Sequence, residues 1–171
     1  MKTLVLIAEE GERKLLAQYL PQCETSSDYE VLVTGVGALN IVRSLRDVPR
    51  DTPLLNIGYA GSANFAIGSV VCVNEVSLHH PNVTYNEPTL HLSTDALKML
   101  KDNDIEPLEA KCYSSCDFVL QSPYKNCVFD MELAYIAALG FERLCSIKIV
   151  SDNLSLHDYR EFGSGVESTQ N

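Results

Sequence analysis

The chain has 171 residues, close to the usual size of one domain of about 150 residues, so a single domain over residues 1–171 is expected. Its 13 Lys and Arg against 23 Asp and Glu give a formal net charge of −10, and so acidic a surface argues against nucleic acid or a membrane as partner. With 46% hydrophobic and 21% charged residues, the sequence is too apolar for disorder and predicts a packed core.

The amino-terminal segment predicts a strand rather than a signal peptide. Its apolar run over residues 3–8 ends in Glu9, Glu10 and Glu12, whereas a signal peptide needs a longer apolar stretch and a small-residue cleavage site. We therefore expect a cytoplasmic protein. Residues 54–73 carry no charge over about one bilayer span, but their Gly, Asn and Ser residues favour two buried strands joined by a glycine loop.

Apolar runs and helical periodicity alternate along the rest of the chain. Strands are expected over residues 3–8, 31–33, 54–57, 69–76, 110–113, 128–129 and 144–150. Helices are expected over residues 12–20, 38–45, 130–139 and 156–162, and Ser93 is expected to cap a further helix with Leu97 and Leu100 on its inner face. Residues 77–89 and His91 are expected in loop, and the adjacent His79 and His80 are not expected to bind metal. This alternation predicts a three-layer α/β/α fold with a mixed, mostly parallel central sheet.

Acidic residues and glycines follow the predicted strands, at the edge where ligands collect beside such sheets. They are Glu9, Glu10 and Glu12 after the first strand, residues 35–37 after the second, 58–61 after the third, 130–132 beside the sixth, and Ser151 and Asp152 after the last. We expect three carboxylates and two glycine loops to converge at this edge.

The six cysteines indicate buried thiols rather than a metal site. They lie far apart, without a CxxC pair or zinc-like spacing, at positions 23, 72, 112, 116, 127 and 145. No metal and no cofactor are expected.

Seven short segments occur in an order typical of one protein family. They cover residues 1–12 with Leu15 and Leu16, 34–37 with Asn40, 56–61, 68–71 with Glu75, 115–118, 130–132 and 150–152. From Met1 to about Phe162 the sequence resembles the nucleoside phosphorylase superfamily, and within it the 5'-methylthioadenosine/S-adenosylhomocysteine nucleosidases. The resemblance implies a shortened nucleoside phosphorylase-like domain that hydrolyses the N-glycosidic bond of an adenine nucleoside, and a homodimer.

The resemblance implies catalytic roles for two carboxylates. Cleavage builds positive charge on the ribose and negative charge on the purine, and carboxylates suit both sides. Asp152 would be the general acid at purine N7, for which its pKa must be raised, and Glu12 would take a proton from the attacking water. The alternatives are a helix cap for Asp152 and a solvated acidic surface for Glu12.

Four further residues match positions that bind the nucleoside. Glu132 would bind the ribose hydroxyls, and Met131 would lie against sugar and base. Phe118 would stack on the purine, and the backbone of Val119 would read the base edge. The alternatives are an exposed acid in the first turn of a helix for Glu132 and core packing for Phe118.

Other binding positions depart from the family pattern or complete it. Tyr59 replaces a small residue at the pocket floor, beside Ala60 and Gly61. Lys148 stands where the nucleosidases usually place an Arg near the water. Tyr159 would close over the ribose, and Ser151 precedes Asp152 in the family's Ser-Asp motif.

The residues expected at the anion site favour water over phosphate as the nucleophile. Phosphorylases of this superfamily carry a glycine-rich loop with Arg after the first strand and another Arg at the position of Asn56. The glutamates found here would repel phosphate. The alternatives are a nucleoside phosphorylase, a purine- or nucleoside-binding protein without turnover, and a structural α/β domain. The loop over residues 77–92 is shortened, so the 5'-substituent stays open and futalosine-type hydrolysis remains an alternative.

Overall fold

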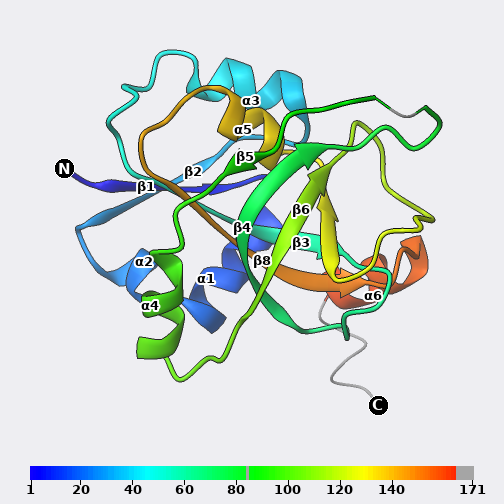
Figure 1. Cartoon of the computed structure of the whole chain (residues 1–171). Helices are drawn as coiled ribbons and strands as arrows, with labels where there is room; N and C mark the ends of the chain where they lie inside the picture. The colour runs from blue at the N-terminus through cyan, green and yellow to red at the C-terminus, as the bar shows by residue number, and fades with distance from the viewer. Residues whose placement is uncertain (84, 165–171) are drawn as a thin grey trace.

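The structure is a computed structural model that describes residues 1–83 and 85–164. Within these residues the chain forms an eight-stranded sheet with helices on both faces (Figure 1). The strands are β1 (Thr3–Ile7), β2 (Tyr29–Val33), β3 (Leu54–Gly61), β4 (Val70–Leu78), β5 (Leu90–His91), β6 (Leu108–Ser114), β7 (Cys127–Asp130) and β8 (Leu144–Asp152). The helices are the 3-10 helix η1 (Glu10–Glu12), α1 (Arg13–Tyr19), α2 (Gln22–Thr25), α3 (Ala38–Leu45), α4 (Ala96–Asp102), α5 (Leu133–Ala138) and α6 (Leu156–Ser164).

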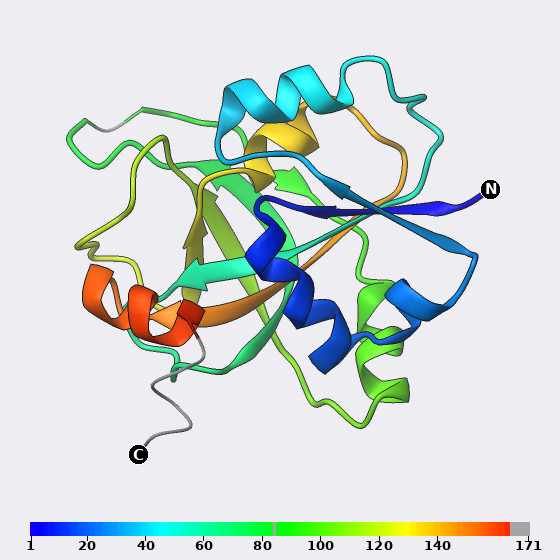
Figure 2. The same cartoon turned by 180° about the vertical axis from the view of Figure 1, so that it is seen from behind.

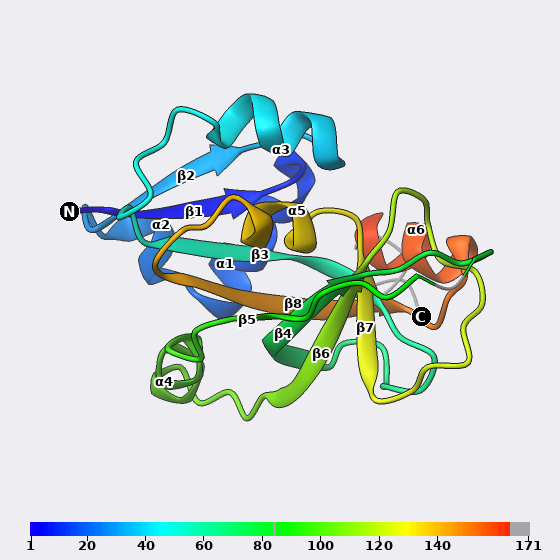
Figure 3. The ribbon, with the colours of Figure 1, turned by 45° about the horizontal axis from the view of Figure 1, so that its top comes forward.

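The sheet is mixed and mostly parallel. Among the described strands, β1 pairs in parallel with β2 and β3, β3 with β8, β4 with β6, and β6 with β7. The antiparallel pairs are β3 with β7, β4 with β5, and β4 with β8. Strands β3, β8, β4, β6 and β7 therefore pair in a closed ring, from which β1 and β2 extend on one side and β5 on the other (Figure 3).

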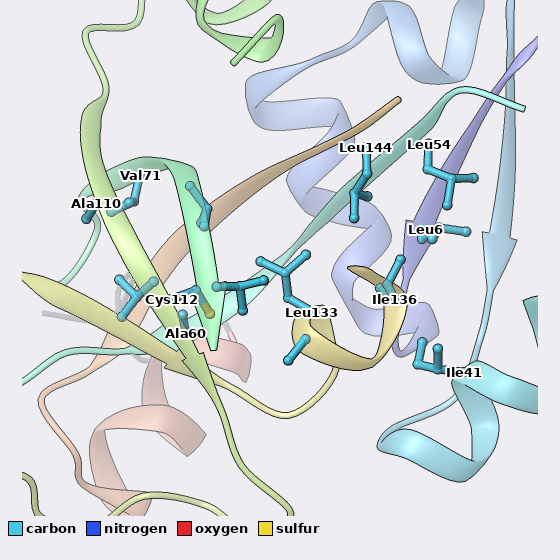
Figure 4. Close-up of a cluster of buried hydrophobic side chains, with 14 of the residues drawn as sticks. Leu6, Ile41, Leu54, Ala60, Val71, Ala110, Cys112, Leu133, Ile136 and Leu144 are labelled. Carbon is cyan, nitrogen blue, oxygen red and sulfur yellow. The ribbon is translucent and has the colours of Figure 1, made fainter. Parts of the chain in front are cut away.

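Alternating side chains divide the core between the two faces of the sheet. Leu6 of β1 packs with Ile41 of α3 and with Leu133 and Ile136 of α5 (Figure 4). The neighbouring Val5 and Ile7 pack on the opposite face with side chains of α1, α2 and α4. Helices α3 and α5 accordingly form one layer and α1, α2 and α4 another, while Phe162 of α6 packs against the second cluster (Figure 2). The predicted three-layer fold is confirmed.

The third strand is longer than predicted and includes the expected glycine loop. Strand β3 continues through Gly58 to Gly61 because this stretch pairs with β8, Gly58 opposite Lys148 and Tyr59 opposite Ile149. This pairing with β8, joined at Gly61 by a pairing with Phe129 of β7, overrides the low strand propensity of glycine.

Several predicted boundaries were wrong for local reasons. His91 lies in β5, where it pairs with Glu75. Helix α4 begins at Ala96 after Asp95, while Ser93 does not cap it but accepts the Asp95 N–H at 3.2 Å. Helix α5 begins only at Leu133, because Asp130 pairs with Ser114 at the end of β7. The short helix α2 was not predicted.

Four of the six cysteines are buried, as predicted, and two are not. All six lie within the described residues and are free, but Cys116 is exposed and Cys145 is half-buried. Cys116 lies in the loop after β6, where its thiol is 3.6 Å from the Tyr135 hydroxyl of α5. Within residues 1–83 and 85–164, no helix is long and apolar enough to cross a membrane.

Candidate active site

A pocket of about 180 Å³ opens beside the carboxyl ends of β1, β3 and β8. Ten of the twelve residues expected at the site line it: Glu12, Tyr59, Ala60, Gly61, Phe118, Met131, Glu132, Ser151, Asp152 and Tyr159. Segments far apart in the sequence thus converge as the strand-end rule predicts. Val119 and Lys148 do not line this pocket.

Glu12 is buried at the end of η1 and is held by backbone donors. Its Oε1 accepts the N–H of Ala8 at 2.8 Å and of Glu9 at 3.1 Å, and its Oε2 accepts the N–H of Tyr59 at 2.9 Å. Burial raises the pKa of Glu12, although these donors and the charge of Lys148 oppose the rise. Glu10, in contrast, is exposed and pairs with Arg13, so the buried acid of this run is Glu12.

Asp152 ends β8 and is 1% exposed. Its Oδ2 accepts the Ser151 hydroxyl at 2.8 Å, and its Oδ1 accepts the Leu154 N–H at 2.9 Å. The side chain therefore binds the loop before α6 and also lines the pocket. The capping alternative predicted otherwise, since α6 begins only at Leu156 and its Asp158 N–H binds the Ser155 hydroxyl at 3.2 Å. Burial raises the pKa of Asp152, which favours a carboxyl group that retains its proton.

Glu132 is buried at the start of α5, which contradicts the alternative of an exposed helix acid. Its Oε2 accepts the N–H of Gly37 at 2.8 Å, where a φ of +85° at Gly37 turns the chain into α3. Burial and the negative charge of Asp130 raise the pKa of Glu132 to about 7, against the opposing charge of Lys148.

Aromatic rings close the side of the pocket next to α6. Tyr159 of α6 meets Phe118 edge-on at 5.6 Å between ring centroids and Tyr59 at 6.3 Å. Tyr59 also meets Phe162 at 5.8 Å. Tyr59 thus links β3 to α6 and also lines the pocket.

Two expected binding residues lie outside the pocket. The side chain of Val119 packs with Cys127 and Phe129 and lines a smaller, adjoining pocket of about 30 Å³. Lys148 is fully buried in β8, where its Nζ lies 2.9 Å from Asp130 Oδ2. The expectation that Lys148 contacts the reacting water has no support, because the ammonium group faces Asp130.

Asp130 is the main residue of the site that the sequence did not assign. Its carboxylate binds Lys148, the Ser114 hydroxyl and the Leu133 N–H. Burial raises the pKa of Asp130, but Lys148 and Ser114 outweigh this effect and hold it below its usual value. The available signal was Lys148 itself, since a lysine inside an apolar strand needs a buried anion. Val36, Phe129, Ala8 and Glu9 also line the pocket and were not assigned.

The pocket wall is acidic. Glu9, Glu12, Glu132 and Asp152 line it, and among the described residues no Lys, Arg or His does so. In the same part of the chain, no group of three or more His, Cys, Asp or Glu side chains is placed to hold a metal ion.

The fold is shared with solved structures of methylthioadenosine nucleosidases. A mutant of the Helicobacter pylori nucleosidase MTAN with 5'-methylthioadenosine in its active site aligns with a TM-score of 0.71 at 17% identity, over 98% of this chain and 92% of that chain. The Streptococcus pneumoniae MTA/SAH nucleosidase in complex with 8-aminoadenine aligns with a TM-score of 0.71 at 20% identity, over 99% and 96%.

A third structure extends the likeness to another hydrolase. The futalosine hydrolase of H. pylori aligns with a TM-score of 0.71 at 17% identity, over 98% of this chain and 91% of that chain. Neither a protein-family model nor a curated protein matches the sequence. At these identities the likeness establishes the fold, and the chemistry must be argued from the site.

Proposed function

We propose that the protein is a purine nucleosidase that hydrolyses the N-glycosidic bond to a free base and a ribosyl product. The observation that carries this proposal is the pair of buried carboxyl groups in one pocket, Glu12 and Asp152, each held by backbone donors and each with a raised pKa. An acid that keeps its proton can protonate the leaving purine, and a second carboxylate can accept the proton of the nucleophile. Asp152 takes the first role and Glu12 the second.

Water is the nucleophile in this proposal. The carboxylate proposed as the base, Glu12, repels a phosphate ion, and the lining described above offers no cation to bind one. Phosphorolysis is therefore the weaker alternative.

The other side chains of the pocket fit a nucleoside. Glu132 accepts hydrogen bonds from the ribose hydroxyls, and Met131 lies against the sugar. Phe118 stacks on the base, and Tyr159 covers the ribose from α6. The substrate is an adenine nucleoside such as methylthioadenosine or adenosylhomocysteine, and futalosine-type hydrolysis is the alternative for the 5'-group.

A homodimer in the cytoplasm completes the proposal. Helix α3 exposes Leu39 and Val42 beside Val36, which lines the pocket, so an apolar surface adjoins the site. A second copy covering this surface would shield the pocket mouth. Free thiols at all six cysteines agree with a reducing compartment.

The test incubates the protein with methylthioadenosine, adenosylhomocysteine or inosine, with and without phosphate. Chromatography then measures the free base that is released. Adenine release without phosphate is the expected result. Turnover that requires phosphate would identify a phosphorylase. Binding of adenine that raises the melting temperature, without turnover of any of these nucleosides, would identify a non-catalytic purine-binding protein.

A further inference from the structure

A buried polar network links β6, β7 and β8 to the start of α5, behind the pocket. The Ser114 hydroxyl of β6 donates to Asp130 Oδ1, and its oxygen accepts the Ala134 N–H at 2.9 Å. Asp130 Oδ2 accepts the Leu133 N–H at 2.8 Å and the Lys148 ammonium at 2.9 Å. Ser114 is fully buried, and the Asp130 and Lys148 side chains are 1% and 2% exposed.

This network holds the first two residues of the helix that Glu132 precedes. The N–H groups of Leu133 and Ala134 belong to the first turn of α5, where backbone donors have no partner within the helix. Asp130 and Ser114 satisfy both, so the backbone just after Glu132 has one orientation. The Gly37 N–H binds the Glu132 carboxylate itself at 2.8 Å.

We infer that Ser114, Asp130 and Lys148 are positioning residues that aim Glu132 into the pocket as the acceptor for ribose hydroxyls. The inference rests on the proposed function for the identity of the ligand. Lys148 acts through Asp130: without the ammonium, the buried Asp130 carboxylate would take up a proton and lose strength as an acceptor for the helix N–H.

The network also determines the electrostatic surroundings of Glu132. The groups that face it are Asp130 of β7, Lys148 of β8, Glu12 of η1, Tyr135 of α5 and Tyr159 of α6. Asp130 raises the pKa of Glu132 and Lys148 lowers it, while the two phenols stay neutral at physiological pH. Removing the Asp130 charge alone therefore makes Glu132 easier to ionise.

The experiment measures affinity by calorimetry for adenine and for formycin A, a nucleoside whose carbon–carbon glycosidic bond resists hydrolysis. Ser114→Ala and Asp130→Asn should each weaken the affinity for formycin A about tenfold, because the nucleoside binds Glu132 through its ribose. The affinity for adenine, which does not bind Glu132, should change by no more than about twofold. Lys148→Met should behave like Asp130→Asn, and Lys148→Arg, which keeps the charge, should restore formycin A binding.

Ser146→Ala is the matched control. Ser146 is also fully buried, and its hydroxyl bonds Asn56 Oδ1 at 2.7 Å instead of α5. A general loss of stability would affect Ser146→Ala as much as Ser114→Ala, whereas positioning predicts a formycin-specific loss in Ser114→Ala alone. Unchanged formycin A affinity in both Ser114→Ala and Asp130→Asn would overturn the inference.

A measurement without ligand separates this inference from the proposed function. The carboxyl carbon resonance of Glu132 should titrate at a pH of about 7 in the parent protein and at a lower pH in Asp130→Asn. If the parent binds neither adenine nor formycin A, the proposed function is wrong, and the same titration in Ser114→Ala then decides the inference. This variant removes no charge, so a shifted midpoint would show that Ser114 holds Glu132 in place, and an unchanged midpoint would overturn the inference.

Discussion

Gly58 faces the carboxylate of Glu12 so closely that a β-carbon at residue 58 would lie 2.6 Å from Glu12 Oε2. Three residues along the same strand, a β-carbon at Gly61 would lie 2.7 Å from Asp152 Oδ1. Strand β3 thus leaves room for the two proposed catalytic carboxyl groups because residues 58 and 61 have no side chain. Neither glycine has a positive φ, so the lack of space for a β-carbon, and not the backbone conformation, accounts for glycine at these two positions.

Gly58→Ala should displace Glu12 and lower kcat by about 10²-fold, the usual effect of moving a catalytic group by about 1 Å. Gly11→Ala is the control, since a β-carbon there would meet nothing within 4 Å. Steady-state kinetics of adenine release checks both variants. If Gly58→Ala released adenine at the rate of the parent protein, the position of Glu12 would not matter for turnover.

Asp152→Asn should lower kcat by roughly 10² to 10⁴, because the amide keeps the shape but has no proton to transfer to the purine. Glu12→Gln should also abolish most turnover and leave adenine affinity nearly intact. Glu10→Gln, in the exposed part of the same acidic run, should retain the parent rate. Equal rates in all of these variants would mean that the carboxylates are structural.

The raised pKa of Glu132, from 4.5 to about 7, makes stability depend on pH. The folded protein binds this proton more tightly than the unfolded chain, so the free energy of unfolding should fall as the pH rises between 4.5 and 7. The contribution of this one group amounts to up to about 3 kcal/mol. Urea unfolding at several pH values should show this loss in the parent and not in Glu132→Gln, which carries no ionisable group there. Parallel pH profiles would contradict the assignment.

The buried Lys148–Asp130 ion pair predicts a strong asymmetry between single and double substitutions. Lys148→Met should destabilise the protein by about 3–5 kcal/mol, because it leaves a buried carboxylate unpaired, and Lys148→Met with Asp130→Asn should recover much of that loss. Because the pKa of Asp130 is lowered, the stabilisation by the pair should be present at neutral pH and lost as the solution becomes acidic.

The surface pair of Lys98 and Asp102, whose Nζ and Oδ2 lie 2.8 Å apart, is the control for the buried pair. Lys98→Met should leave the free energy of unfolding nearly unchanged, because solvent screens exposed pairs. Urea unfolding curves of these three variants and of Asp130→Asn alone supply the comparison. Additive effects of the Lys148 and Asp130 substitutions would show that the two groups do not interact.

Leu39→Glu together with Val42→Glu should convert the proposed homodimer to a monomer, since both side chains are exposed on α3, at 72% and 45%. Leu108→Glu, at a similarly exposed apolar residue on β6, should leave the dimer intact. Sedimentation at micromolar concentration distinguishes the species. A parent protein that sediments only as a monomer of 18.9 kDa would exclude the dimer.

The sequence predicted those parts of the fold that depend on local pattern. Helix α3 matches its predicted range of 38–45, because its apolar positions Ile41 and Leu45 recur at helical spacing after a glycine with positive φ. The extent of β3 was missed, because its glycines become a strand only through pairing with β8. Likewise, residues after strand ends identified the pocket, but Asp130 could not be matched to Lys148, since spacing along the chain does not encode which buried charges meet across a sheet.

The closed ring of β3, β8, β4, β6 and β7 constrains the register of the strands that form the site. In the described part of the chain, the sheet ends only at β2 and at the two-residue strand β5. Each strand that carries Gly58, Asp130, Lys148 or Asp152 is hydrogen-bonded on both sides. A slip of one residue in any of them would break two ladders at once and turn every second side chain to the wrong face. The alignment of the carboxyl groups is thus tied to strand register, so a misregistered chain would lose its core together with its pocket.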